Sequence, residues 1–89
     1  MYTLVYYVRT TYYVRTTESE TVYENEYHGE EFRLKKDALH FVRKSSKEFY
    51  IENGYTIENV KNGLNCYKII SNTKEVRETI ETRVRVEKI

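Results

Sequence analysis

Apolar and polar residues alternate along the start of the chain, which is the pattern of a β-strand that buries one face. The six residues YYVRTT occur twice in succession from Tyr6 to Thr17. Because six is even and side chains of a strand point to alternate sides, the repeat keeps each residue type on one face. One face is mostly apolar and consists of Leu4, Tyr6, Val8, Tyr12 and Val14, and the other carries Tyr7, Arg9, Thr11, Tyr13 and Arg15. The pattern predicts one long strand, lengthened by a local duplication.

A second alternating segment, residues 20–28, follows a turn at 16–19. Pairing Arg15 with Glu20 predicts an antiparallel hairpin. The other expected pairs are Tyr13 with Val22, Thr11 with Glu24, Arg9 with Glu26, Tyr7 with His28, Tyr12 with Tyr23 and Val8 with Tyr27. Cross-strand pairs of opposite charge or of aromatic rings each contribute about 0.2–1 kcal/mol, so this register satisfies both faces of the hairpin.

A helical periodicity begins after Gly29, where the second strand is expected to end. Apolar or small residues recur at helical spacing, at Leu34, Ala38, Phe41, Val42, Ser45 and Phe49. Most of the basic residues of this segment lie off that stripe. Asn53-Gly54 is a good stop signal, because glycine readily takes the left-handed position after a helix. We therefore expect one amphipathic helix at about 34–51.

An Asn-Gly pair separates two short segments, 55–60 and 64–70, and predicts a hairpin. A two-residue turn would place Ile57 opposite Lys68. A three-residue loop with a left-handed glycine would instead place Ile57 opposite Tyr67. The three-residue loop keeps apolar residues together and is preferred.

The last segment, 75–88, has β-branched residues two apart at Val84 and Val86, which favours a strand. The order β-β-α-β-β-β predicts an α+β fold for a single domain of residues 1–89, with two layers: a mainly antiparallel five-stranded sheet and one helix packed on one face. The two longest strands, the first and the fifth, are expected to pair centrally, giving the order second, first, fifth, fourth, third. The helix is expected to bury Leu34, Phe41 and Phe49 against Leu4, Val8, Val84 and Val86.

Composition adds limits on location and partners. The net charge of +1 provides no global attraction to nucleic acid or to an anionic membrane. A single cysteine, Cys66, excludes an internal disulfide and suits a reducing compartment. No basic start is followed by an apolar core, as in a signal peptide, and no apolar run approaches the roughly 20 residues of a membrane span. We expect a soluble, cytoplasmic protein that does not bind membranes.

The uncovered face of the sheet is the candidate partner-binding surface. Its expected members are Tyr7, Arg9, Tyr13, Arg15, Arg83 and Arg85. Tyrosine, with ten copies, and arginine are both enriched at protein interfaces. Aromatic rings interleaved with arginine also occur in RNA-binding and single-strand-binding modules. Six carboxylates and no Lys or Arg lie between Glu18 and Glu31, so a protein partner is preferred, with nucleic acid as the alternative and a homodimer as a third possibility.

No catalytic or ligand motif stands out. Glu24, Glu26 and His28 share a strand face and could in principle hold a metal, but ligands on an exposed strand are usually solvated. His40 and Cys66 are interpreted as structural residues. There is no P-loop, dinucleotide fingerprint or CxxC pair. We expect no enzymatic activity, no cofactor and no metal.

Size and the lack of motifs favour a small binding protein. Compact chains of this kind are common among phage and mobile-element accessory proteins, and many of these occupy a host protein's surface, including inhibitors of host defence. By this analogy we expect an adaptor or inhibitor.

Overall fold

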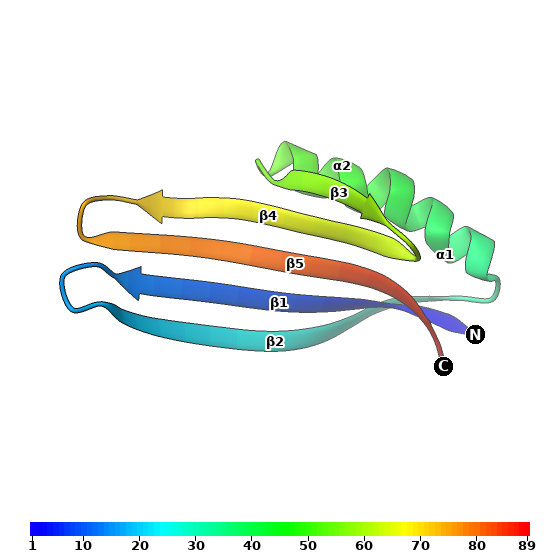
Figure 1. Cartoon of the computed structure of the whole chain (residues 1–89). Coiled ribbons are helices and arrows are strands. Elements are labelled where there is room, and N and C mark those ends of the chain that lie inside the picture. The colour runs from blue at the N-terminus through cyan, green and yellow to red at the C-terminus, as the bar shows by residue number, and fades with distance from the viewer.

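The computed structural model describes residues 1–89 and contains one five-stranded sheet with a helix on one face (Figure 1). The elements are β1 (Tyr2–Val14), β2 (Ser19–Phe32), α1 (Lys35–Phe41), a π-helical turn η1 (Val42–Ser46), α2 (Lys47–Glu52), β3 (Thr56–Val60), β4 (Gly63–Asn72) and β5 (Val76–Lys88). All neighbouring strands are antiparallel, in the order β2-β1-β5-β4-β3. The predicted α+β architecture and strand order are confirmed.

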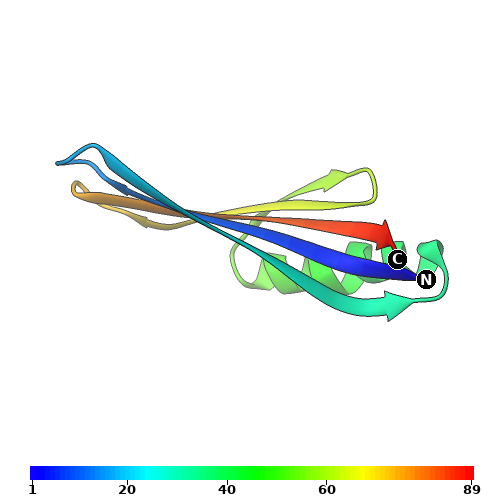
Figure 2. The same ribbon diagram turned by 90° about the horizontal axis from the view of Figure 1, so that it is seen from below.

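The helix covers only one end of the sheet (Figure 1). The β1–β2 and β4–β5 hairpins extend beyond it, and the molecule measures 50 × 24 × 18 Å. We call the end with these two hairpin turns the distal end. Figure 2 shows that the strands twist along their length, and β-strands normally have a right-handed twist. No helix has the length and apolar character needed to cross a membrane.

The helix runs without a break through α1, η1 and α2, and η1 changes which residues face the sheet. The buried helical residues are four apart, at Ala38, Val42, Ser46 and Tyr50. A step of four residues overshoots one α-helical turn of about 3.6 residues. The wider π turn takes up the extra residue and keeps this series directed at the sheet.

The expected burial of the helix was therefore partly wrong. Leu34 is 47% exposed and Phe49 is 57% exposed, whereas Phe41 is partly buried and packs against the core. Val8 is only half-buried. The core consists of Leu4, Ala38, Val42, Tyr50, Leu64, Cys66, Val84 and Val86.

The expected β1–β2 register was wrong by two residues. Arg9 lies opposite Glu24, and Tyr13 lies opposite Glu20. The turn occupies residues 15–18, with Glu18 in the left-handed region at φ 51°. Because the shift is even, every side chain keeps its predicted face. The strand also continues past Gly29, where it was expected to end.

Neither expected register of the β3–β4 hairpin is present, since Ile57 lies opposite Cys66. The turn has two residues, and its second, Asn62, takes the left-handed conformation at φ 61°. Gly63 instead begins β4 and serves a different purpose. A Cβ atom there would lie 1.8 Å from the carbonyl oxygen of Val84, so only glycine allows β4 to approach β5 at this point.

Candidate binding site on the uncovered sheet face

Three shallow hollows lie side by side on the face of the sheet that the helix leaves uncovered. Their volumes are about 440, 350 and 300 Å³, and Glu81 on β5 lines all three. Together we call them the trough, defined by Tyr7, Arg9, Tyr13, Tyr67, Glu81 and Arg83. Strand alternation places these side chains on one face, and the strand order brings β1, β5 and β4 together beneath them.

Tyr7 is held in place from two sides. Its hydroxyl donates a hydrogen bond of 2.5 Å to Oε2 of Glu87. The guanidinium carbon of Arg83 lies 5.4 Å from the centre of its ring, within the range of a cation–π contact. The hydrogen bond to Glu87, together with desolvation, raises the pKa of Tyr7 to about 12. The hydroxyl is therefore a fixed donor at neutral pH.

Arg9 and Glu24 form an exposed ion pair across β1 and β2. Arg9 Nε lies 3.5 Å from Glu24 Oε1, and the two side chains are 54% and 70% exposed. An ion pair with this exposure typically contributes only about 0.2–1 kcal/mol, so either side chain can turn to a partner at little cost. The expected pairing of Arg9 with Glu26 is wrong, because Arg9 pairs with Glu24.

Two residues of the trough, Tyr67 and Glu81, were not among the expected binding residues. They lie opposite each other on β4 and β5. The Tyr67 hydroxyl accepts a hydrogen bond of 3.4 Å from Arg77, and Arg77 lies opposite Tyr13 on β1. Sequence reasoning missed them because their meeting depends on the β4–β5 register, and alternation alone does not show which residues meet across strands.

Arg15 lies at the distal end, where it joins the two hairpin turns. Its Nη2 donates to Asn72 Oδ1 at 2.7 Å, and its Nε donates to the Thr73 carbonyl at 3.1 Å. Its backbone N–H also donates to the Glu75 carbonyl at 2.8 Å. The expected pairing of Arg15 with Glu20 is absent from the strand register, because Glu20 lies opposite Tyr13.

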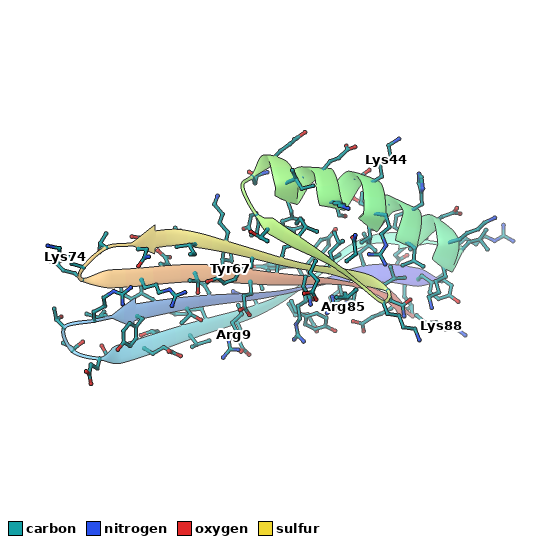
Figure 3. The ribbon with its side chains drawn as sticks, turned by 45° about the horizontal axis from the view of Figure 1, so that its top comes forward. Arg9, Lys44, Tyr67, Lys74, Arg85 and Lys88 are labelled. Atoms are coloured by element: carbon teal, nitrogen blue, oxygen red, sulfur yellow. The ribbon has the colours of Figure 1, made fainter.

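Arg85 fastens β4 to β5 at the other end of the face. Its Nη1 donates to the Leu64 carbonyl at 2.9 Å, and its Nη2 donates to Asn65 Oδ1 at 2.7 Å. Burial lowers the pKa of this guanidinium from its ordinary value. Arg15 and Arg85 thus share the face with the trough, but their guanidinium groups are bound within the fold. Figure 3 shows how Arg9, Tyr67 and Arg85 are spaced along the sheet.

Carboxylates outnumber guanidinium groups on the uncovered face. The strand registers and the lining of the hollows place five arginines there, Arg9, Arg15, Arg77, Arg83 and Arg85, together with seven glutamates, Glu20, Glu24, Glu26, Glu31, Glu58, Glu81 and Glu87. Exposed basic residues instead gather at and before the helix, at Arg33, Lys35, Lys36, Arg43 and Lys44. The uncovered face is thus a mixed surface with an acidic excess, and the trough lies within it.

The titratable groups are not arranged as a metal or nucleophile site. No three His, Cys, Asp or Glu side chains are grouped to hold a metal ion. His28 and Glu26 form a pair at 3.3 Å. The Cys66 thiol is buried in the core, and this burial raises its pKa to about 11, so the thiol is protonated at neutral pH.

Comparisons of the chain with models of protein families, with curated proteins and with solved structures found no match.

Proposed function

We propose that this chain is a small, non-enzymatic protein-binding module whose partner docks on the trough. The observation that carries the proposal is the row of Tyr and Arg side chains along the trough, in hollows that are also lined by the carboxylates of Glu20, Glu24, Glu26 and Glu81. Tyrosine and arginine combine a large contact area with a polar group and dominate many interfaces. Alternating charges favour a partner with a complementary mixed pattern.

Preorganisation of the trough supports this proposal. Glu87 and Arg83 already fix the ring of Tyr7, so little side-chain entropy remains to be lost on binding. Arg15 similarly joins the two hairpin turns at the distal end. A partner would therefore meet a rigid sheet and not a flexible loop.

Single-stranded nucleic acid is the alternative ligand for the same face. Phosphate binding requires an excess of Lys and Arg, and carboxylates repel the phosphate backbone. The acidic excess on the uncovered face therefore favours a protein partner.

The specific form that we propose is an adaptor or inhibitor that occupies another protein's surface inside the cell. The analogy is with phage and mobile-element accessory proteins, including antagonists of host defence. A free thiol at Cys66 suits an intracellular location.

Capture of a partner by trough variants tests the proposal. The double variant Arg9→Ala/Tyr13→Ala removes two trough side chains, and Lys36→Ala/Lys44→Ala is the control on the exposed face of the helix. We expect the wild type and the control to retain the same protein from a lysate of the source cells, and the trough variant to lose it. Equal capture by all three proteins would contradict docking at the trough.

Two further measurements distinguish nucleic acid, or a second copy of the chain, from a different protein as the partner. Fluorescence anisotropy with labelled single-stranded DNA, RNA and duplex, at about 50 and 200 mM salt, detects phosphate contacts. Micromolar binding that weakens steeply with salt would favour nucleic acid over protein. Light scattering reports the oligomeric state, and a wild-type dimer that dissociates in the trough variant would identify the partner as a second copy.

A further inference from the structure

A second concave site lies on the opposite face of the sheet, where β1 and the end of β2 meet the helix. It is a groove of about 350 Å³. Its main lining residues are Tyr6, Glu30, Phe41, Ser46, Phe49 and Tyr50. Three unusual features of the fold converge on this groove: a β-bulge, a π-helical turn and a buried hydroxyl without a partner.

Aromatic rings form the walls of the groove. The rings of Phe49 and Tyr50 meet edge to face, with centroids 5.2 Å apart and an angle of 83° between their planes. Tyr6 lies against Gly29, where a Cβ atom would be 2.8 Å from Cε2 of the Tyr6 ring. Any larger residue at Gly29 would push this ring away. Phe49 is 57% exposed, which leaves the groove open to solvent on its side.

A β-bulge in β2 turns Glu30 into the groove. Simple alternation would place Glu30 on the uncovered face with Glu26. The β1–β2 register shifts by one residue between Thr3 and Val5, so that Glu30 lines the groove on the helix side. Bulges often redirect a side chain in this way. The Thr3 hydroxyl donates to the Glu30 carbonyl at 3.3 Å and so helps to hold the bulge.

Ser46 supplies a buried hydroxyl that has no well-formed hydrogen bond, although the Tyr6 hydroxyl is its neighbour. The residue is 6% exposed, and its Oγ has no hydrogen-bond partner. Burial raises the pKa of Tyr6, and the nearby Ser46 hydroxyl lowers it by a smaller amount. The two hydroxyls are therefore neighbours, but they are not placed at the distance and angle of a hydrogen bond. Unsatisfied buried groups are rare, and π-helical turns such as the one that contains Ser46 frequently occur at functional sites.

We propose that this groove binds an organic cation, with an alkylammonium group on the exposed ring of Phe49, beside the buried ring of Tyr50 and opposite the carboxylate of Glu30. Aromatic faces attract such cations through the negative potential of their π-systems. A hydroxyl or carbonyl of the ligand pairs with Ser46 Oγ. The same chemistry is offered by a free quaternary amine and by a methylated lysine side chain of a protein.

NMR titration of the full chain tests the proposal with three probes: choline, its neutral isostere 3,3-dimethyl-1-butanol, and a peptide carrying trimethyllysine. We expect choline or the peptide to shift the amide signals of Ser46 and Phe49, and to bind about tenfold or more tightly than the isostere. Tighter binding of the peptide identifies a methylated side chain as the ligand, and tighter binding of choline identifies a free amine. Equal binding of the isostere, or no shift with either cation, would overturn the proposal.

Two variant pairs locate the cation within the groove. Phe49→Ala removes one aromatic wall, and Ile51→Ala is its control because Ile51 is similarly exposed on α2 and lies outside the groove. Glu30→Gln removes the carboxylate charge, with Glu31→Gln as its control. We expect each groove variant to bind about fivefold to tenfold more weakly and each control to bind as the wild type does. Unchanged affinity in both groove variants would also overturn the proposal, and the amide spectra show that each variant is folded.

Discussion

Replacing Gly63 by alanine tests the closest approach of two strands in the fold. The added Cβ would lie 1.8 Å from the Val84 carbonyl oxygen and 2.9 Å from its carbon. Both atoms belong to the backbone of β5, so no side-chain rotation relieves the clash. A tolerable contact requires at least 3.0 Å, so the start of β4 has to move away from β5 by more than 1 Å.

The magnitude follows from the contacts that this movement breaks. The Val86 N–H donates to the Asn62 carbonyl at 2.8 Å, and Arg85 Nη1 donates to the Leu64 carbonyl at 2.9 Å. Each bond contributes about 0.5–1.5 kcal/mol, and each buried group left without a partner costs about 1–3 kcal/mol. We expect Gly63→Ala to lower the free energy of unfolding by about 3 kcal/mol. A domain of this size has only about 4–13 kcal/mol in total.

Urea denaturation followed by far-UV circular dichroism measures this loss. With a slope of about 1–1.5 kcal/mol per molar urea, the midpoint of Gly63→Ala should fall by about 2–3 M. Lys61→Ala, in the adjacent exposed turn, is the control and should stay within about 0.5 kcal/mol of the wild type. A Gly63→Ala variant within about 1 kcal/mol of the wild type would refute the reasoning about the strand approach.

Four further changes have defined outcomes. Ser46→Ala removes an unpartnered buried hydroxyl and favours the helix, so urea denaturation should show a gain of about 1–2 kcal/mol, and a loss would mean that Oγ has a partner. Because the folded-state pKa of Tyr7 is raised to about 12 from 10.0, its contribution to stability is fully present below pH 10 and is lost as the pH rises toward 12. ¹³C NMR titration should show this pKa, and Glu87→Gln should move it toward 10; an unchanged pKa in that variant would contradict the hydrogen bond as its cause. The Cys66 thiol, buried and with a pKa of about 11, should react with a disulfide reagent at pH 8 only when urea unfolds the chain, and rapid reaction of the folded protein would contradict its burial. Arg85→Ala should cost about 1–3 kcal/mol in the same urea assay, since two acceptors on β4 lose their donor, and an unchanged midpoint would show that the guanidinium does not fasten β4.

The sequence predicts which side chains of a long strand share a face of the sheet, but it does not predict which residues pair between neighbouring strands. The doubled YYVRTT segment keeps Tyr7, Arg9 and Tyr13 on one face under any even shift of the hairpin. The actual shift of two residues depends on the turn at 15–18 and its left-handed Glu18, which alternation does not encode. The face of the trough was therefore predicted, although its ion pairs were not.

The groove was not predicted because it depends on departures from regular periodicity. A bulge moves Glu30 from the uncovered face to the helix side of the sheet. A π turn directs Ser46 and Tyr50, and not Phe49, toward the sheet. Patterns of period 2 or 3.6 contain no signal for either feature. The internal bonds of Arg15 were equally hidden, since they join turns more than fifty residues apart in sequence.

Site-specific photo-crosslinking in the source cells tests most directly whether the trough binds a protein. Tyr13 in the trough and Lys44 on the exposed face of the helix are each replaced, in separate proteins, by p-benzoylphenylalanine (Figure 3 shows Lys44). Irradiation should yield a covalent adduct with one protein from the Tyr13 position and none from the Lys44 position. An adduct from the helix position alone, or none from Tyr13, would contradict docking at the trough.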